Sequence, residues 1–364
     1  MRKWSNASWN LNIIPNYLPS IAILIPVYNE EKVIRLKLEN ISQVVYPKDK
    51  MEIIVVNDSS TDNTINEVNN YIKSHKLPST EIFDSKVHLG KTGCLNKALG
   101  NIQADIVIIS DVDCFWPHDI LLKSLHYLSD VNVGAITARE FLLNPSDNWV
   151  TLGEQFYDST IQAVRIGESK MHSTIFFQGG FAAYRRNLLT AFNQATDDSG
   201  TALDVIQLNR RAILIPEIGF FTVSPTAWTN KIAVKVRRAS HLQHLWAKCL
   251  RLLIWRKLAF PKRIAMPEII LHLFNPIFLV IFIILSSLLL INYPLLAIVS
   301  LLLFCGLFII KKTRMSTLEF MQNNFILLVS LISFLTGRKF RVWKPIIESR
   351  SALSDSILRE NQLI

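Results

Sequence analysis

The protein has 364 residues, half of them hydrophobic, which suffices for one large domain with an appendage or for two domains. Its four cysteines have no repeated spacing, which argues against a disulfide framework and a cysteine zinc site. Lys and Arg number 39 against 29 acids, a net charge of +10, and they gather beside apolar runs, at 231–263, 311–314 and 338–344. This placement favours a membrane surface over a nucleic acid, because elsewhere no aromatic residues interleave with the cations.

The first part of the chain alternates short apolar runs with helical patterns. Residues 21–27 (IAILIPV) are typical of a strand covered on both faces, and residues 30–44 follow with helical periodicity. The alternation continues with a strand at 51–57, a helix near 62–74, a strand near 81–83, a helix from about 92 and a strand at 105–110. This order predicts an α/β fold with a mostly parallel sheet and helices on both faces.

Two carboxylates, Asp111 and Asp113, stand one residue apart where the last of these strands ends, and Asp58 ends another strand. Ligands of such sheets bind beyond the carboxyl ends of the strands, so all three are expected at one pocket. Crowded carboxylates need a partner, and their oxygens suit Mg or Mn, which would neutralise the charge on a departing diphosphate. A D-x-D pattern alone is weak evidence, because short acidic patterns occur in many loops.

After residue 141 the pattern is less regular, with helices expected around 149–166 and 201–209. Residues 241–260 alternate apolar and basic positions at helical spacing, which favours an amphipathic helix at a membrane interface, with a core helix as the alternative. The first twenty residues lack the apolar core of a secretory signal.

Apolar runs at 269–291 and 295–310 are almost free of charge and close to the length of a membrane span. With both spans in place, the cations at 311–314 lie on the cytosolic side, as the positive-inside rule expects. A third apolar segment, about 318–336, is followed by more cations. We interpret it as re-entrant or interfacial, with a third span as the alternative.

Six stretches occur in one order from about residue 21 to 225: ILIPVYNEE, VVNDSSTDNT, HLGKTGCLNKALG, ISDVDC, QGGFAAYRR and TDDSGTALDVIQLNRRAILIPE. This series resembles the motifs of family 2 glycosyltransferases of the Rossmann-like GT-A fold. The membrane half resembles the integral-membrane branch that includes hyaluronan, chitin and cellulose synthases and polyisoprenyl-phosphate glycosyltransferases. The resemblance implies a nucleotide-sugar donor, with a UDP-sugar favoured, a divalent metal (Mg or Mn), and inversion at the anomeric carbon.

On the donor side, the resemblance implies that Asp58 holds the uracil or ribose, while Asn57 stands where many members have another aspartate. Asp113 matches the metal-binding acid, and Asp111 matches its partner at the ribose or the metal. Lys91 matches a donor-contacting position, with a solvated lysine after a glycine turn as the alternative. The further donor-binding positions are Pro26, Tyr28, Glu30 and Arg238.

An inverting transfer needs a base that takes the proton from the acceptor hydroxyl. Asp198 of the TDDSG motif is the candidate, and Asp197 is the neighbour that could replace it. The alternative is that either residue only caps the following helix. Gln178, Gly179 and Gly180 resemble the acceptor-side turn, where glycines let the backbone approach a ligand closely.

Two further stretches bear on the type of transferase. Processive polysaccharide synthases usually carry Q-x-x-R-W where this chain has Lys235 and Ala239 flanking Arg238, and the missing tryptophan puts long-chain processivity in doubt. Residues 343–350 (WKPIIESR) resemble the post-membrane loop that covers the donor site in some relatives, with a basic tail on the lipid surface as the alternative.

The sequence therefore predicts the following segments: an N-terminal segment (1–20), a GT-A domain (21–230), interfacial helices (231–264), a membrane region (265–336) and a basic cytosolic tail (337–364). We expect a multi-pass cell-membrane protein whose cytosolic domain transfers a hexosyl or hexosaminyl group to a lipid-linked or glycan acceptor. Its partners would be the nucleotide sugar, the acceptor and membrane lipids. The alternatives are a processive polysaccharide synthase and a non-catalytic nucleotide-binding membrane protein.

Overall fold

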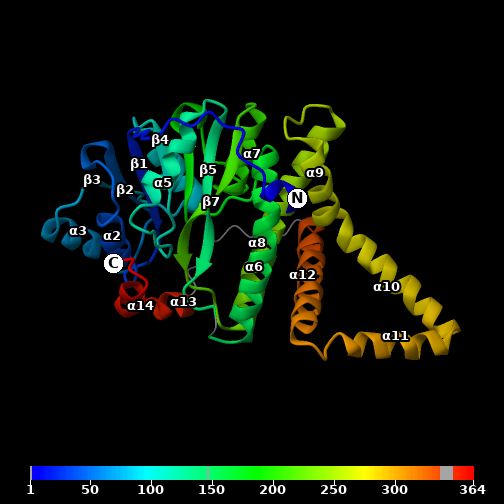
Figure 1. Ribbon diagram of the computed structural model, residues 1–364. Coiled ribbons are helices and arrows are strands. Elements are labelled where there is room, and N and C mark those ends of the chain that lie inside the picture. Colours follow the sequence, from blue (N-terminus) through cyan, green and yellow to red (C-terminus); the bar gives the residue numbers. More distant parts are fainter. Residues whose placement is uncertain (1, 146, 337–346) are drawn as a thin grey trace. The chain divides into compact units, whose positions relative to one another are not determined.

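The computed structural model describes residues 2–145, 147–336 and 347–364 (Figure 1). The chain divides into two compact units. The first comprises Met1–Thr226 and Arg341–Ile364, and the second comprises Ala227–Phe340.

A seven-stranded sheet in the order β3-β2-β1-β4-β6-β5-β7 forms the centre of the first unit (Figure 1). Its strands are β1 (Ile21–Val27), β2 (Met51–Asn57), β3 (Ser79–Asp84), β4 (Ile106–Ile109), β5 (Val133–Leu142), β6 (Ala182–Arg185) and β7 (Arg211–Thr222). β1 pairs in parallel with β2 and β4, β2 with β3 and β5 with β7, whereas β6 runs antiparallel to β4 and β5. The predicted α/β class with a mostly parallel sheet is confirmed.

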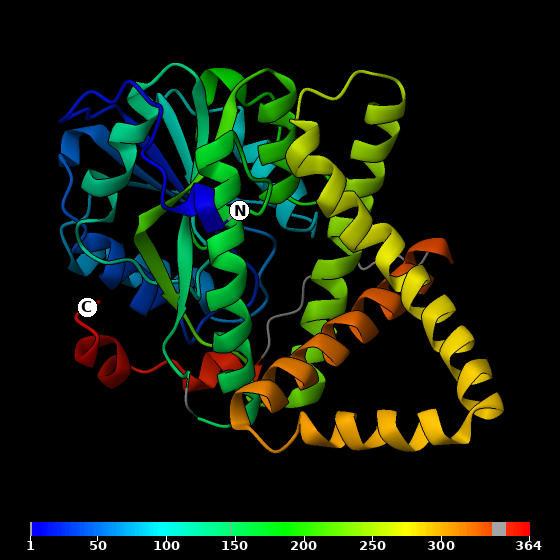
Figure 2. The ribbon, with the colours of Figure 1, turned by 45° about the vertical axis from the view of Figure 1, so that its right-hand side comes forward.

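Helices of the first unit connect and cover these strands. They are α1 (Arg2–Ser5), α2 (Ile34–Ser42), η1 (Lys48–Lys50), α3 (Thr64–Ser74), α4 (Lys91–Leu99), α5 (Ile120–Ser124), η2 (Leu125–Ser129), α6 (Trp149–Met171), η3 (Arg186–Leu188), α7 (Ser199–Gln207), α13 (Ile347–Ala352) and α14 (Asp355–Glu360). α6 starts at a capping box made by Asn148 and Thr151 and packs against β7, beside the sheet in Figure 2. α2 begins later than the pattern suggested, because Asn29 adopts a positive φ of 55° and residues 31–33 form a turn.

The central strands β1 and β4 are buried on both faces, as their continuous apolar sequences predict. Every residue of β1 and β4 is buried. Successive side chains of a strand point to opposite faces, so such a strand needs a helix layer on each side. One layer includes α2, whose Ile34, Leu38 and Ile41 share a core cluster with β1, while α4 also packs on β1 and β2.

The end of the chain returns to this core instead of forming the tail that the sequence suggested. Leu353, Leu358 and Leu363 are buried in the same cluster as α2. The Asn40 side chain on α2 donates to the backbone oxygen of Leu363 (2.6 Å), and Arg35 pairs with Asp355 (2.7 Å). Figure 1 shows α13 and α14, in red, beside the blue α2. Residues 347–364 are therefore an integral part of the first unit, because their leucines are covered there.

The second unit consists of helices: α8 (Trp228–Ile254), α9 (Lys262–Ile269), the π-helical turn η4 (Ile270–Phe274), α10 (Asn275–Asn292), α11 (Pro294–Gly306) and α12 (Lys311–Leu335). α8 packs along α12. Buried polar contacts join these two helices, including Lys231 to Glu319 (3.4 Å) and the Gln243 side chain to the Leu327 oxygen (3.0 Å).

Two helical runs in this unit, Lys262–Asn292 and Thr313–Leu335, are long and apolar enough to cross a membrane. The first contains the predicted span 269–291. The predicted span 295–310 is not matched, because α11 has 13 residues, about 20 Å at 1.5 Å per residue against roughly 30 Å of hydrocarbon. The segment expected to be re-entrant instead forms part of α12, because the polar residues before it continue the same helix.

The C-terminal packing predicts a clear effect on stability. Leu358→Ala truncates a fully buried side chain and should lower the melting temperature of the first unit by about 5–15 °C, since replacing a buried leucine by alanine costs about 2–5 kcal/mol. The measurement is thermal unfolding of the full chain in detergent. Leu208→Ala, at a position that is 53% exposed, is the matched control and should change little. Equal melting temperatures for both variants would contradict the packing of the chain end.

Candidate active site

The site lies where the parallel strands end. β1 pairs with β2 on one side and with β4 on the other, and Val27, at the end of β1, lies opposite Asn57 at the end of β2. The strand order reverses at this point, which opens a crevice in sheets of this kind. Tyr28, Asp58 and Ser110 directly follow the three strands, so the chain places polar residues there.

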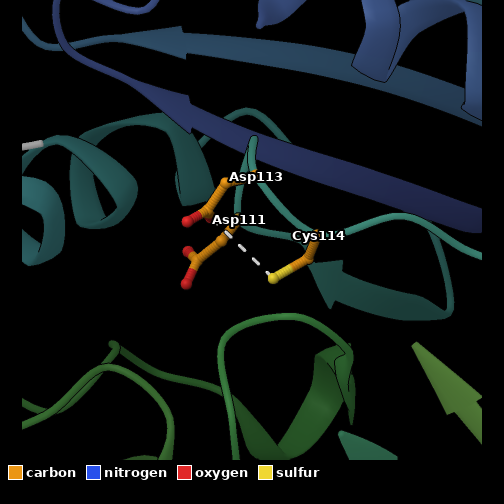
Figure 3. A group of neighbouring side chains, drawn as sticks. All are labelled: Asp111, Asp113 and Cys114. Carbon is orange, nitrogen blue, oxygen red and sulfur yellow. Dashed lines mark hydrogen bonds between the residues drawn. The ribbon is translucent and has the colours of Figure 1, made fainter. Parts of the chain in front are cut away.

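The predicted metal ligands are brought together in one turn. The ligand atoms of Asp111, Asp113 and Cys114 all lie within 4.8 Å of one another, and both carboxylates point to the same side of the turn (Figure 3). Burial raises the pKa of the Cys114 thiol well above its usual range, so it stays protonated and is a poor ligand. The two carboxylates therefore form the donor set, which fits a hard cation such as Mg or Mn.

Lys91 connects this turn to the second acidic pair. Its Nζ lies 2.7 Å from Asp111 Oδ1 and 2.8 Å from Asp197 Oδ2. Burial lowers the pKa of Lys91, but the two carboxylates outweigh burial and raise it above its usual range. The side chain is only 16% exposed, so Lys91 is not the solvated lysine of the alternative interpretation. Its contact with the donor stays a prediction.

Asp198 combines the two roles that the sequence left open. Its side chain accepts a hydrogen bond from the backbone N–H of Ser199 and so caps α7, while its backbone oxygen accepts one from the Tyr184 hydroxyl (3.0 Å). Burial, and then the neighbouring charge of Asp197, raise the pKa of Asp198 to about 6. A carboxylate with this pKa is a better proton acceptor near neutral pH than an ordinary aspartate. Asp198 can therefore cap α7 and also act as a general base.

Arg350 is a site residue that the sequence reasoning did not single out. Its guanidinium donates to both carboxylate oxygens of the buried Glu30 (2.7 and 2.8 Å) and to Asp113 Oδ2. Burial raises the pKa of Glu30 to about 7. Burial would also raise the pKa of Asp113, but Arg350 outweighs it and holds that pKa below its usual range.

The resemblance of residues 343–350 to a donor-site loop was the available signal for Arg350. Residues 343–346 of that stretch lie outside the described residues. Arg350 itself lies in α13, near the end of the chain, and its contact with Glu30 joins residues 320 positions apart.

Asp58 is buried directly after β2, and a backbone N–H holds one of its carboxylate oxygens. It accepts from the backbone N–H of Leu89 (2.7 Å) and lies 3.0 Å from His88 Nδ1. The ring of His88 packs on Tyr28, with centroids 4.4 Å apart. Asn57 donates to Asp84 (2.6 Å), a bond that an aspartate could not make. His88 is thus a further candidate that only the structure identifies.

The glycines of the predicted acceptor turn, Gly179 and Gly180, allow this turn to contact the D-x-D turn closely. The backbone N–H of Asp111 donates to the Gly179 oxygen (2.7 Å), and a Cβ on Gly179 would lie 2.4 Å from Asp111 Oδ2. A Cβ on Gly180 would lie 2.2 Å from the Phe220 ring. Gln178 donates to Glu140. The close approach is thus to the D-x-D turn, and the contact with an acceptor stays a prediction.

The remaining predicted residues lie elsewhere. Pro26 is buried within β1, one residue before its end. Arg238 lies on α8, in the second unit, and its role in binding the donor stays a prediction.

Within the first unit, two series of contacts connect the residues of the site. One joins Glu30, Arg350 and Asp113. The other joins Gly179, Asp111, Lys91 and Asp197.

Comparison with known proteins gives consistent matches. Residues 22–192 match the glycosyl transferase family 2 model. A mannosyltransferase from Pyrobaculum calidifontis, solved with GDP-Man and Mn2+, matches with a TM-score of 0.76 and 27% identity over 93% of each chain. This similarity confirms the expected fold class, a GT-A domain followed by C-terminal helices.

Two curated relatives are named for the products of their reactions. Beta-monoglucosyldiacylglycerol synthase from Nostoc sp. is 28% identical over 193 residues, 51% of this chain and 38% of its own length. Poly-beta-1,6-N-acetyl-D-glucosamine synthase from Staphylococcus epidermidis is 24% identical over 170 residues, 46% of this chain and 40% of its own. The chain thus matches well under half the length of either relative.

The contact between the two turns yields a prediction. Gly179→Ala should weaken the binding of Mn2+ to the purified chain by about 10- to 100-fold, because its Cβ would displace the Asp111 carboxylate. Electron paramagnetic resonance of free Mn2+ measures the affinity. Gly100→Ala is the control, since its Cβ would make only an ordinary contact at 3.7 Å. Unchanged affinity in Gly179→Ala would show that the Asp111 carboxylate is not a ligand.

Proposed function

We propose that the chain is a membrane-bound, metal-dependent, inverting glycosyltransferase, whose residues 22–192 match the family 2 model and have the GT-A fold. It moves a sugar from a nucleoside-diphosphate donor to a lipid-linked or glycan acceptor at the cytosolic face. A UDP-sugar remains the favoured donor on the motif resemblance, and the relative solved with GDP-Man makes a GDP-sugar the alternative.

The observation that carries this proposal is the position of Lys91 between the D-x-D turn and the Asp197–Asp198 pair. An inverting transfer needs a leaving-group site and a base in one pocket. Lys91 contacts an acid of each group, so one side chain fixes the distance between them. A shifted pKa alone does not identify a catalytic residue, because structural ion pairs also shift pKa values. Here the acid with the raised pKa, Asp198, lies beside the carboxylates of Asp111 and Asp113, which suit a cation.

Each residue has a distinct role in the proposed reaction. Asp111 and Asp113 would hold the divalent cation, which neutralises the charge on the leaving diphosphate when it is bound. Asp58 would contact the nucleoside. The acceptor oxygen forms a bond to the anomeric carbon while the bond to the diphosphate oxygen breaks, and Asp198 takes the acceptor proton. Lys91 stays protonated and keeps Asp197 in place.

The second unit supports an acceptor at the membrane. Two of its helical runs are long and apolar enough to span a bilayer, and α8 combines basic residues with the exposed Trp228, as interfacial helices do. The glucosyldiacylglycerol synthase among the relatives acts in lipid synthesis by its name, and this supports a lipid acceptor. Residues 235–239 depart from the pattern of processive synthases, which supports a single addition.

The test is a transfer assay in membranes. UDP- and GDP-sugars are supplied with Mn2+ or Mg2+, and nucleoside diphosphate release and labelled lipid are measured. We expect turnover with one donor class, and a fall of about 100-fold or more in Asp113→Asn, since a metal site contributes several kcal/mol. The control is Asp49→Asn, at an exposed position in η1. Full activity of Asp113→Asn would refute the metal-dependent mechanism, and a ladder of long products would favour a processive synthase.

The raised pKa of Asp198 predicts the pH dependence. The carboxylate is charged only above about 6, so kcat/KM should fall about tenfold per pH unit as the pH drops below that value. Asp198→Asn should abolish this dependence together with most of the activity. The measurement is a pH profile at saturating metal. A level profile down to pH 5 would assign the base to another residue.

A further inference from the structure

A buried lysine lies behind the D-x-D turn, and the proposed reaction does not use it. Lys37 on α2 has no exposed surface. Its Nζ donates to Ser110 Oγ (2.6 Å) and to the backbone oxygen of Cys114, and it lies 4.8 Å from the centre of the Trp116 ring. Burial lowers its pKa to about 8, so it still carries its proton at pH 7. Both of its acceptors are neutral oxygens, which is an unusual arrangement for a buried ammonium.

The two acceptors flank the D-x-D sequence. Ser110 directly precedes Asp111, and Cys114 directly follows Asp113. Lys37 therefore holds both ends of the segment that carries the two carboxylates. Only one backbone hydrogen bond closes the turn from within, from the Cys114 N–H to the Asp111 oxygen (3.2 Å). A contact at both ends limits how far the carboxylates can move apart.

The same face of α2 connects this turn to the glycine turn. Ser110 Oγ and Trp116 Nε1 both donate to the Gly180 oxygen, at 3.2 and 2.7 Å. Asn40, one helical turn after Lys37, accepts from the Trp116 N–H (2.9 Å) and donates to its oxygen (2.8 Å). In a buried network of this kind each bond constrains the next, so loss of one member affects the geometry of the others.

We propose that Lys37 is a positioning residue that holds Asp111 and Asp113 in the arrangement that binds the divalent cation. The inference rests on the proposed function, because it takes this turn as the cation site. The charge of Lys37 cannot favour cation binding, since a positive charge beside a cation site opposes binding of the cation. Its hydrogen bonds to Ser110 and Cys114 provide the alternative explanation. The charge of Lys37 lowers the affinity for the cation, whereas its hydrogen bonds raise it by positioning the carboxylates. Removing the lysine therefore shows which of the two effects is larger.

The experiment measures Mn2+ affinity of the purified full chain without donor, by electron paramagnetic resonance. Lys37→Met keeps most of the length of the side chain but removes the ammonium, and should weaken binding about 10- to 100-fold. Ser110→Ala removes one of the two contacts and keeps the charge, so it should weaken binding less. Lys73→Met, at an exposed position on α3, is the matched control and should bind as the wild type does. Thermal unfolding checks that each variant is folded.

The outcomes separate the two proposals. If the wild type binds Mn2+ and Asp113→Asn does not, the cation site stands. Unchanged or tighter binding by folded Lys37→Met would then overturn the positioning role and leave only a structural one. If Lys37→Met does not fold, wild-type affinity in Ser110→Ala overturns the role. If the wild type itself binds no Mn2+, the proposed metal site fails, and the inference fails with it.

Discussion

The arrangement of the site depends on the cost of placing several carboxylates in a partly buried crevice. An unpaired buried charge is strongly unfavourable, so each carboxylate needs a cation or hydrogen-bond donors. Lys91 lies between Asp111 and Asp197, and Arg350 lies between Glu30 and Asp113. Each cation serves two acids, so negative charge remains in excess. A divalent cation would balance this excess, which is a physical reason for metal binding beyond the D-x-D pattern itself.

These cations come from distant parts of the chain, and this makes the site a property of the whole first unit. Lys91 starts α4, and Arg350 follows the entire second unit in sequence. The leucines around Leu358 bury the chain end against α2, so the hydrophobic core determines where Arg350 can reach. Synthesis must therefore pass through the apolar helices before the crevice receives its last cation.

Several residues of the site also have purely structural roles in the fold. Gly179 is required because the D-x-D turn approaches its backbone, and Asp198 caps a helix while having a raised pKa. Asn57 joins two strand ends through a donor that an aspartate lacks. The departure of Asn57 from the family pattern thus has a local structural reason. A structural role for a residue does not exclude a role in the reaction, since both need the same fixed position.

Much of the fold followed from local pattern. The buried strand 21–27, the alternation with helices and the position of Asp111 and Asp113 at a strand end were all predictable, because burial and strand geometry leave periodic signals. Membrane spans were harder to delimit. Hydropathy located the apolar runs, but the helix boundaries decided which run was long enough. α11 covers only Pro294–Gly306, and α12 begins at Lys311.

By itself, the sequence determined the fold class, the acidic turn and the order of the motifs, because each depends on neighbouring residues. Only the tertiary structure decided the partners of those acids. Arg350 reaches Asp113 across 237 positions, and His88 meets Asp58 from another loop. Lys37 reaches Ser110, next to the acidic turn, across 73 positions. Such pairings leave no local periodicity, since they arise only when the core brings α2, the strand ends and the C-terminal segment together.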